Sequence, residues 1–187
     1  MTDFYINPIF WIGFYLVGYT ITIAVLGISG MRTKAKNKIP KPLMRTFILL
    51  TFIAPPVVLP FTRGPKTAIP TPIALTVGMI ILGINFVIKI LAQRQIGVSP
   101  ALKSNGKLVT TGIYGWVRHP LYLSNGLLAL GMAILFKSLF ALLFSIPYSL
   151  SYLLIIHFEE KALLEEYGED FKSYKKKVPW RMIPGIV

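Results

Sequence analysis

The chain alternates between long apolar segments and short polar ones. Five apolar segments stand out, and they are Pro8–Gly30, Leu43–Phe61, Thr71–Ala92, Leu121–Phe136 and Ser138–Phe158. An α-helix needs about 20 mostly apolar residues to cross a bilayer, and the fourth segment is shorter than that. The pattern therefore predicts an all-α, polytopic membrane protein with five transmembrane helices.

Local features refine this prediction at three places. The Pro55-Pro56 pair removes two backbone donors, so the second helix should be kinked or broken there. Lys137 alone separates the fourth and fifth apolar segments, which predicts a tight helical hairpin. After the fifth segment, residues 159–177 have an amphipathic pattern, which predicts a continuing helix with a break at Gly168.

Composition supports a membrane protein and excludes some chemistry. Apolar residues make up 54% of the 187 residues, charged residues make up 14%, and mean hydropathy is +0.63. A soluble domain usually carries about 25% charged residues, so the apolar side chains are expected to face lipid. The chain has no cysteine, which excludes disulfides, thiolate metal sites and a cysteine nucleophile. We expect no metal site.

Basic residues gather in three segments, and these predict the orientation. The net charge is +13, and most lysines and arginines lie in residues 31–45, 93–120 and 159–187. With five spans these segments fall on one side of the membrane, which the positive-inside rule makes cytoplasmic. The N-terminus is then outside and the C-terminus is cytoplasmic. Because topology accounts for the charge, we do not expect nucleic acid as a partner.

Two charged pairs lie at the cytoplasmic ends of the fourth and fifth segments. Arg118-His119 directly precedes Pro120, which suits the first turn of a helix, and Glu159-Glu160 follows the fifth segment. The predicted hairpin brings these two pairs together at one membrane surface. Ionisable groups at such a depth are costly and often functional. In the alternative interpretation, the arginine snorkels and the glutamates only solvate a helix end.

The segment at residues 106–117 has the composition of a binding pocket. Leu108, Val109 and Tyr114 offer flat or apolar surfaces to a ring. Gly112 lets the backbone come close to a ligand. Apolar walls with a few polar anchors are typical of small-molecule sites.

Two motifs together resemble one known family. Residues 106–122 read GKLVTTGIYGWVRHPLY, and residues 159–184 read EEKALLEEYGEDFKSYKKKVPWRMIP. In this order and at this spacing, they resemble the isoprenylcysteine carboxyl methyltransferase and phospholipid methyltransferase family of integral membrane enzymes. The resemblance implies three N-terminal transmembrane helices at residues 1–92 and a methyltransferase core at residues 93–187, within one structural domain.

The same resemblance implies S-adenosylmethionine as the cofactor. By resemblance, the adenosine would lie against Lys107, Leu108, Val109 and Tyr114. This assignment agrees with the apolar character of the segment, because a purine ring needs flat apolar surfaces around it.

The polar end of the cofactor would lie beside the two charged pairs. The residues that would line it are His119, Pro120, Leu121 and Tyr122, with the Arg118 charge beside them. Glu159 would bind the cofactor and Glu160 would support it, because carboxylates suit an ammonium group or ribose hydroxyls. The expected catalytic residues are Arg118, His119 and Glu160.

The implied methyl acceptor is lipid-like, and two residues are expected to face it. Isoprenylcysteine enzymes carry an arginine, implicated in holding the substrate, where this chain has Ile155, and His157 lies nearby. Since isoleucine cannot pair with a carboxylate, we expect a phospholipid amine before a prenylcysteine-like carboxylate. An amine must lose a proton, which His119, His157 or a glutamate could accept. Many relatives also carry a histidine where this chain has Gly106.

Two other classes of function stay open at this point. One is a membrane reductase, because sterol reductases share a related C-terminal module but use NADPH. The other is a non-enzymatic membrane subunit, which would need polar residues along several spans, where this chain has few. The expected partners are membrane lipids and a lipid-like substrate, and the sequence leaves the oligomeric state open.

Overall fold

The chain folds into a bundle of α-helices. The computed structural model describes residues 6–28, 39–96, 103–104 and 107–186. Its elements in chain order are α1 Pro8–Gly27, α3 Lys41–Ile48, η2 Leu49–Ile53, α4 Ala54–Val58, η3 Leu59–Phe61, α5 Thr71–Ile96, β1 Lys103–Ser104, β2 Lys107–Leu108, η4 Gly112–Gly115, α6 Pro120–Leu135 and α7 Leu139–Lys177. The all-α prediction is confirmed, and the two short strands form one small hairpin. The basic segment 31–38 and Gly106 lie outside the described residues.

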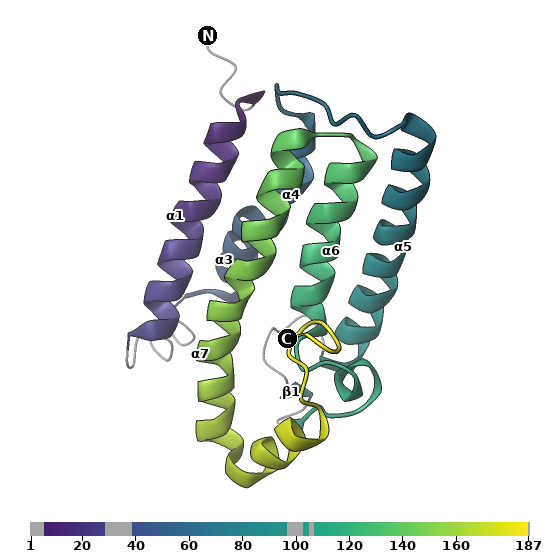
Figure 1. The fold of residues 1–187 in the computed structure, drawn as a ribbon. Helices are drawn as coiled ribbons and strands as arrows, with labels where there is room; N and C mark the ends of the chain where they lie inside the picture. Colours follow the sequence, from purple (N-terminus) through teal and green to yellow (C-terminus); the bar gives the residue numbers. More distant parts are fainter. Residues whose placement is uncertain (1–5, 29–38, 97–102, 105–106, 187) are drawn as a thin grey trace.

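Four helical segments are long and apolar enough to cross a membrane. They are Pro8–Gly27, Pro42–Phe61, Thr71–Ile96 and Leu139–Lys177. The remaining long helix, α6, has 16 residues, and at about 1.5 Å per residue it is shorter than a hydrocarbon core of about 30 Å. The polytopic architecture is therefore confirmed for four helices, whereas the predicted fourth span is a shorter apolar helix that packs between α5 and α7 (Figure 1).

The second span is interrupted where the proline pair predicts a break. A π-helical turn, η2, directly precedes α4, which contains both prolines. Pro56 has no N–H and cannot donate to the carbonyl of Phe52, four residues earlier. The hydroxyl of Tyr148, on α7, donates to this carbonyl instead. The interruption is thus stabilised by a side chain from another helix.

A tight turn joins α6 to α7, as predicted. Lys137 adopts the left-handed conformation, with φ 56. Its N–H donates to the Ile134 carbonyl and the Ser138 N–H donates to the Ala133 carbonyl, both at 3.0 Å, which is the Schellman pattern of a helix end. Ser138 then caps α7 by accepting a hydrogen bond from the Ala141 N–H. Because the turn is this short, α6 and α7 are antiparallel neighbours.

The last part of α7 turns back beneath the bundle. The turn is at Gly168, whose φ of 51 and ψ of −118 interrupt the helix, so the predicted break is confirmed. A glycine allows this conformation because it has no Cβ. Beyond the break, Phe171 and Tyr174 are buried in one apolar cluster with Ile96 and Tyr114. The chain then returns toward the start of α6 (Figure 1).

Small and polar residues allow α5 and α6 to pack closely. The Asn85 side-chain amide donates to the Ser124 hydroxyl at 2.9 Å, and both side chains are buried. Gly78 faces the α6 backbone, where an added Cβ would lie 2.8 Å from the Leu135 Cα. Membrane helices often associate through small residues and interhelical hydrogen bonds in this way. The contact fixes α6, whose first residues belong to the candidate site.

A matched pair of glycine substitutions on α5 tests this contact. Gly78→Ala should lower the free energy of unfolding by about 1–3 kcal/mol, because the new methyl group overlaps backbone atoms of α6. Gly83→Ala is the control, since nothing lies within 4 Å of its Cβ position. It should be neutral or stabilising by up to about 1 kcal/mol, because alanine favours a helix. Unfolding in detergent measures both, and equal effects would contradict the close contact.

Candidate active site

Three segments that are distant in sequence meet at the start of α6. Pro120 is the first residue of α6, and the residues before it pair with the C-terminal tail, residues 178–186. The Arg118 N–H donates to the Trp180 carbonyl at 2.9 Å, and the His119 N–H donates to the Arg181 carbonyl at 2.8 Å. The third segment is the part of α7 that carries the acidic pair. The predicted convergence of the two charged pairs is therefore present.

Arg118 and Glu160 form a buried ion pair at this meeting point. The guanidinium Nε donates to Glu160 Oε1 at 2.8 Å, and a second guanidinium nitrogen lies 2.7 Å from the same oxygen. The two side chains are only 4% and 6% exposed. A further N–H of Arg118 donates to the Val178 carbonyl at 2.6 Å. The arginine is thus engaged with α7 and the tail, and does not snorkel toward solvent.

Two further nitrogen groups lie near the Glu160 carboxylate. Arg181 Nε lies 3.4 Å from Oε2, and His119 Nε2 lies 3.4 Å from Oε1. Burial raises the pKa of this carboxyl, but the neighbouring Arg118 and His119 outweigh burial and lower the pKa to about 2. Glu160 is therefore an anion at neutral pH and a poor proton acceptor.

Glu159, the first residue of the acidic pair, has a different environment. Its Oε1 accepts a hydrogen bond from the Tyr122 hydroxyl at 2.7 Å, and its Oε2 lies 3.7 Å from His119 Nδ1. The side chain is 16% exposed, which makes it the more open of the two carboxylates. The Nε2 atom of His119 is buried and makes no hydrogen bond within the described part of the chain. The site therefore offers one partly open anion and one unsatisfied polar nitrogen.

The residues expected around the adenosine lie beside this charge cluster. Tyr114 is buried, its carbonyl accepts a hydrogen bond from the Tyr174 hydroxyl at 2.7 Å, and Val109 and Leu121 pack against the same apolar cluster. A cavity of about 750 Å³ lies on the outer side of this cluster. Its lining residues are Lys107, Leu108, Thr110, Thr111, Tyr167, Asp170, Ser173, Tyr174, Lys177 and Val178. Val178 links the cavity to Arg118, since its carbonyl accepts the arginine hydrogen bond.

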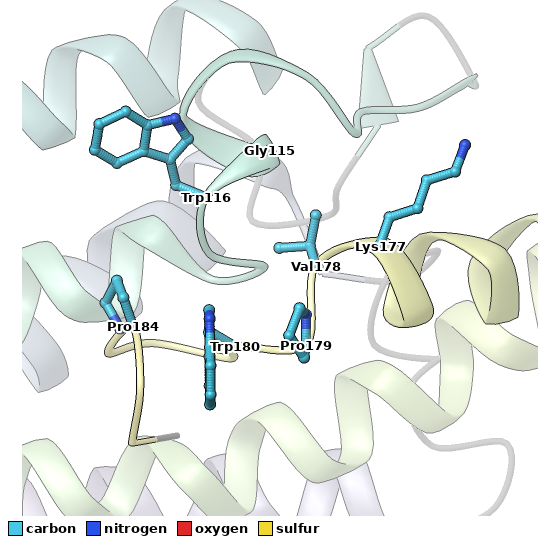
Figure 2. A pocket seen from close by; sticks show the side chains of 7 residues that line it. All are labelled: Gly115, Trp116, Lys177, Val178, Pro179, Trp180 and Pro184. Carbon is cyan, nitrogen blue, oxygen red and sulfur yellow. The ribbon is translucent and has the colours of Figure 1, made fainter.

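A second, smaller cavity lies between η4 and the tail. It has a volume of about 320 Å³ and is lined by Gly115, Trp116, Lys177, Val178, Pro179, Trp180 and Pro184 (Figure 2). Lys177 and Val178 line both cavities. The end of α7 and the start of the tail therefore form part of both cavity walls.

The two residues expected to face a substrate lie on different faces of α7. Ile155 is buried in the main apolar cluster of the bundle. His157 is exposed, and its ring contacts the ring of Phe158. Neither residue makes a hydrogen bond or ion pair with the charge cluster among the described residues. Within those residues, no three His, Cys, Asp or Glu side chains are grouped as metal ligands.

The sequence did not single out several residues that the tertiary structure brings to the site. Arg181 contacts Glu160 only because the tail turns back, and nothing in the local sequence predicts that route. Tyr167 and Asp170 line the larger cavity on the amphipathic part of α7. The helical spacing of Tyr167 was visible in the sequence, but spacing alone does not separate a cavity wall from a packed face.

Comparison with known proteins identifies the class of this membrane protein. The phospholipid methyltransferase (PEMT) family matches residues 73–170, which is more than half of the chain. The match includes α5, α6 and α7 up to the glycine break, and so both charged pairs. The chain belongs to the phospholipid methyltransferase family.

Individual relatives carry several different names. The chain is 36% identical over 92 residues to a Delta(14)-sterol reductase of Methylotuvimicrobium alcaliphilum, covering 45% of this chain and 20% of that protein. It is 40% identical over 73 residues to a protein-S-isoprenylcysteine O-methyltransferase of Schizosaccharomyces pombe, covering 38% and 31%. It is 28% identical over 133 residues to the cobalt-zinc-cadmium resistance protein CzcN of Cupriavidus metallidurans, covering 71% and 59%. The matched segment spans less than two thirds of each relative.

Removing the buried arginine should have a much larger effect than removing an exposed basic residue. Arg118→Met leaves Glu160 buried without its main partner, so the free energy of unfolding should fall by about 3–5 kcal/mol. Lys172→Met is the control, because Lys172 pairs with Glu169 where both side chains are largely exposed. Its effect should stay within about 0.5 kcal/mol. Equal losses in thermal or denaturant unfolding would contradict the buried role of Arg118.

Proposed function

We propose that the protein is an S-adenosylmethionine-dependent methyltransferase that acts on a lipid-borne acceptor, with a phospholipid amine as the first candidate. The observation that carries the proposal is the pairing of Glu159 with Tyr122 and His119 at the end of apolar helices. This arrangement offers a partly open anion and a buried, unsatisfied nitrogen beside a lipid-facing bundle. Membership of the phospholipid methyltransferase family supports the same reaction class.

The groups around the site fit the chemistry of this cofactor. Its ammonium and ribose hydroxyls need acceptors, which Glu159 and Asp170 supply. Its carboxylate needs a cation, and Lys177 lines the larger cavity. Arg118 is already engaged with Glu160 and a tail carbonyl, so we assign it to positioning and not to direct contact with the cofactor. Figure 2 shows the Lys177 side chain at the end of α7, next to Val178 of the tail.

The apolar wall of the site suits the adenosine. We propose that the adenosine lies against Lys107, Leu108, Val109 and Tyr114, and that the polar end lies toward His119 and the first turn of α6. Leu108 lines the cavity, while Val109 and Tyr114 pack in the cluster directly beneath it. Pro120 and Leu121 would hold the polar end of the cofactor through the shape of the helix start, since Pro120 is buried and Leu121 packs in the same cluster.

For methyl transfer, the protein must position the acceptor, exclude water and take up the proton that an amine acceptor loses. The bound cofactor would supply an activated methyl group on its sulfonium, so in-line alignment of the acceptor is the main requirement. An amine acceptor must lose its proton, and His119 is the acceptor that the geometry favours. Its Nε2 is buried, makes no hydrogen bond among the described residues and lies 3.4 Å from Glu160 Oε1. Glu160 itself, with a pKa of about 2, is a poor base.

The position of Ile155 supports an amine over a carboxylate acceptor. Ile155 is buried among aromatic side chains of the bundle, so this part of α7 offers no cation to a substrate carboxylate. His157 is exposed on another face of the helix. A lipid acceptor would reach the site sideways from the bilayer, and the water-soluble cofactor would reach it from the aqueous side.

We propose a cytoplasmic site with the N-terminus outside. The support is the charge distribution. Basic residues are concentrated in the segment before α6 and in the tail, and the positive-inside rule places such segments in the cytoplasm. Lys66 and Lys137 lie at the opposite end of the bundle, where they bind the Phe136 carbonyl and the Thr71 hydroxyl. These two lysines help to hold the ends of α6 and α5, which gives them a structural role on the outer side.

A second candidate function is a reductase that uses NADPH. Its support is the 36% identity to a Delta(14)-sterol reductase over 92 residues. The two candidates differ in the cofactor, so binding of labelled S-adenosylmethionine and of NADPH to the same preparation separates them. We favour the methyltransferase because the family match covers both charged pairs of the site.

Glu159 and a matched glutamate on the same helix test the cofactor site. Glu159→Gln should weaken binding of S-adenosylmethionine by roughly 10- to 150-fold, because one charge-assisted hydrogen bond is lost. Glu165→Gln should leave the affinity unchanged, since Glu165 is exposed, whereas Glu159 is partly buried beside Tyr122 and His119. Calorimetry on the purified proteins measures both. Wild-type affinity in a folded Glu159→Gln protein would remove this residue from the site.

Direct competition between acceptors tests the substrate class. Phosphatidylethanolamine and farnesylcysteine are placed in the same bilayer with limiting labelled cofactor. The label should appear mainly on the phospholipid amine, because the described part of the site offers no free cation next to Ile155 for a carboxylate. A base-labile methyl ester on the prenylcysteine as the main product would show that the acceptor is a carboxylate.

A further inference from the structure

A stack of three rings connects the candidate active site to the core of the bundle. The Tyr122 ring stacks with the His119 ring, with centroids 5.8 Å apart and planes 17° apart. It also stacks with the Tyr152 ring, at 4.7 Å and 22°. Tyr152 comes from the middle of α7 and is almost completely buried. The orientation of the Tyr122 ring, and thus of the hydroxyl on Glu159, therefore depends on Tyr152.

A directed chain of hydrogen bonds fixes Tyr152 in turn. The Phe52 carbonyl can only accept, so the Tyr148 hydroxyl must donate its proton there. At the 2.8 Å contact between the two tyrosine hydroxyls, Tyr152 must then be the donor. The Tyr152 oxygen accepts from the Asn125 side-chain amide at 3.1 Å. Every hydroxyl proton in this chain of hydrogen bonds is assigned, which leaves the Tyr152 side chain one favourable orientation.

The chain begins at the interruption of the second span. The Phe52 carbonyl is available because Pro56 has no N–H to donate to it. The proline break thus provides the acceptor at one end of the chain, and the ring stack provides the link to Glu159 at the other. These short contacts join residues of three helical segments, which are the second transmembrane span, α6 and α7.

We propose that Tyr152 is a positioning residue for the active site, acting through Tyr122 on Glu159. The inference rests on the proposed function in that Glu159 is taken to bind the cofactor. The Tyr152 ring sets the position of the Tyr122 ring by stacking on it. The Tyr152 hydroxyl holds the Tyr152 ring in place through its hydrogen bonds. Simple core packing would predict that Tyr152 variants lose stability without any change at His119 or Glu159.

Histidine resonances give a readout that needs no cofactor. The chain has two histidines, so His119 is assigned in histidine-labelled protein by comparison with His157→Gln. Tyr152→Leu should shift the His119 ring signals, because the Tyr122 ring above them moves. Tyr152→Phe, which keeps the ring, should shift them much less. Tyr19→Phe is the control, since its hydroxyl binds the Ser151 carbonyl in the same core and takes no part in the ring stack or in the hydrogen bonds of Tyr152.

A folded Tyr152→Leu protein with unshifted His119 signals would overturn the proposal. If Tyr152→Leu does not fold, Tyr148→Phe replaces it, because this change removes the hydroxyl to which Tyr152 donates and keeps all rings. A His119 shift in Tyr148→Phe that is larger than in Tyr19→Phe is then the supporting result. Equal signals in these two variants overturn the proposal.

A double-mutant cycle tests the route through Tyr122. Tyr152→Leu should weaken binding of S-adenosylhomocysteine by about tenfold, the lower end of what one charge-assisted hydrogen bond contributes. In a Tyr122→Phe background, which already lacks the bond to Glu159, the same change should have little further effect. Additive losses would overturn the route. If the wild-type protein binds neither form of the cofactor, the proposed function fails, and the His119 signals still decide the role of Tyr152.

Discussion

The ion pair between Arg118 and Glu160 holds together the parts of the chain on which the site depends. Burying two charges is costly, and such a pair is favourable only when most of its hydrogen-bonding groups find partners. Here Arg118 also binds the Val178 carbonyl, and Glu160 also lies near Arg181. The start of α6, the acidic pair of α7 and the tail are thereby held in one place. Glu159 and its neighbours occupy positions that this pair defines.

The long α7 helix links the membrane part of the protein to the site. Its apolar half packs in the bundle, its acidic pair lies at the cluster, and the turn at Gly168 returns its last part beneath α5 and α6. A shift of this helix within the membrane would therefore also move Glu159. The contact of Tyr152 with the Tyr122 ring is one place where such a shift would be transmitted.

The part of the chain that matches the family includes both charged pairs of the site, while the tail lies outside it. The family match begins within α5 and ends near Gly168, whereas α1 and the second span lie outside it. Relatives of the chain carry the names of a reductase, a methyltransferase and a metal resistance protein. Sequence similarity alone therefore does not fix the activity, and the groups that face the ligand must be considered.

The sequence by itself determined the helical segments, the proline interruption, the tight turn at Lys137 and the break at Gly168, because each depends on local backbone chemistry. It also determined that the charged pairs meet, since a one-residue turn leaves the ends of two helices no alternative. Only the tertiary structure decided which atoms pair. Successive residues of a helix are about 100° apart, so the faces of Ile155 and His157 depend on how α7 is rotated within the bundle. The contact of Arg181 with Glu160 depends on the path of a tail that has no regular structure, and no local pattern specifies that path.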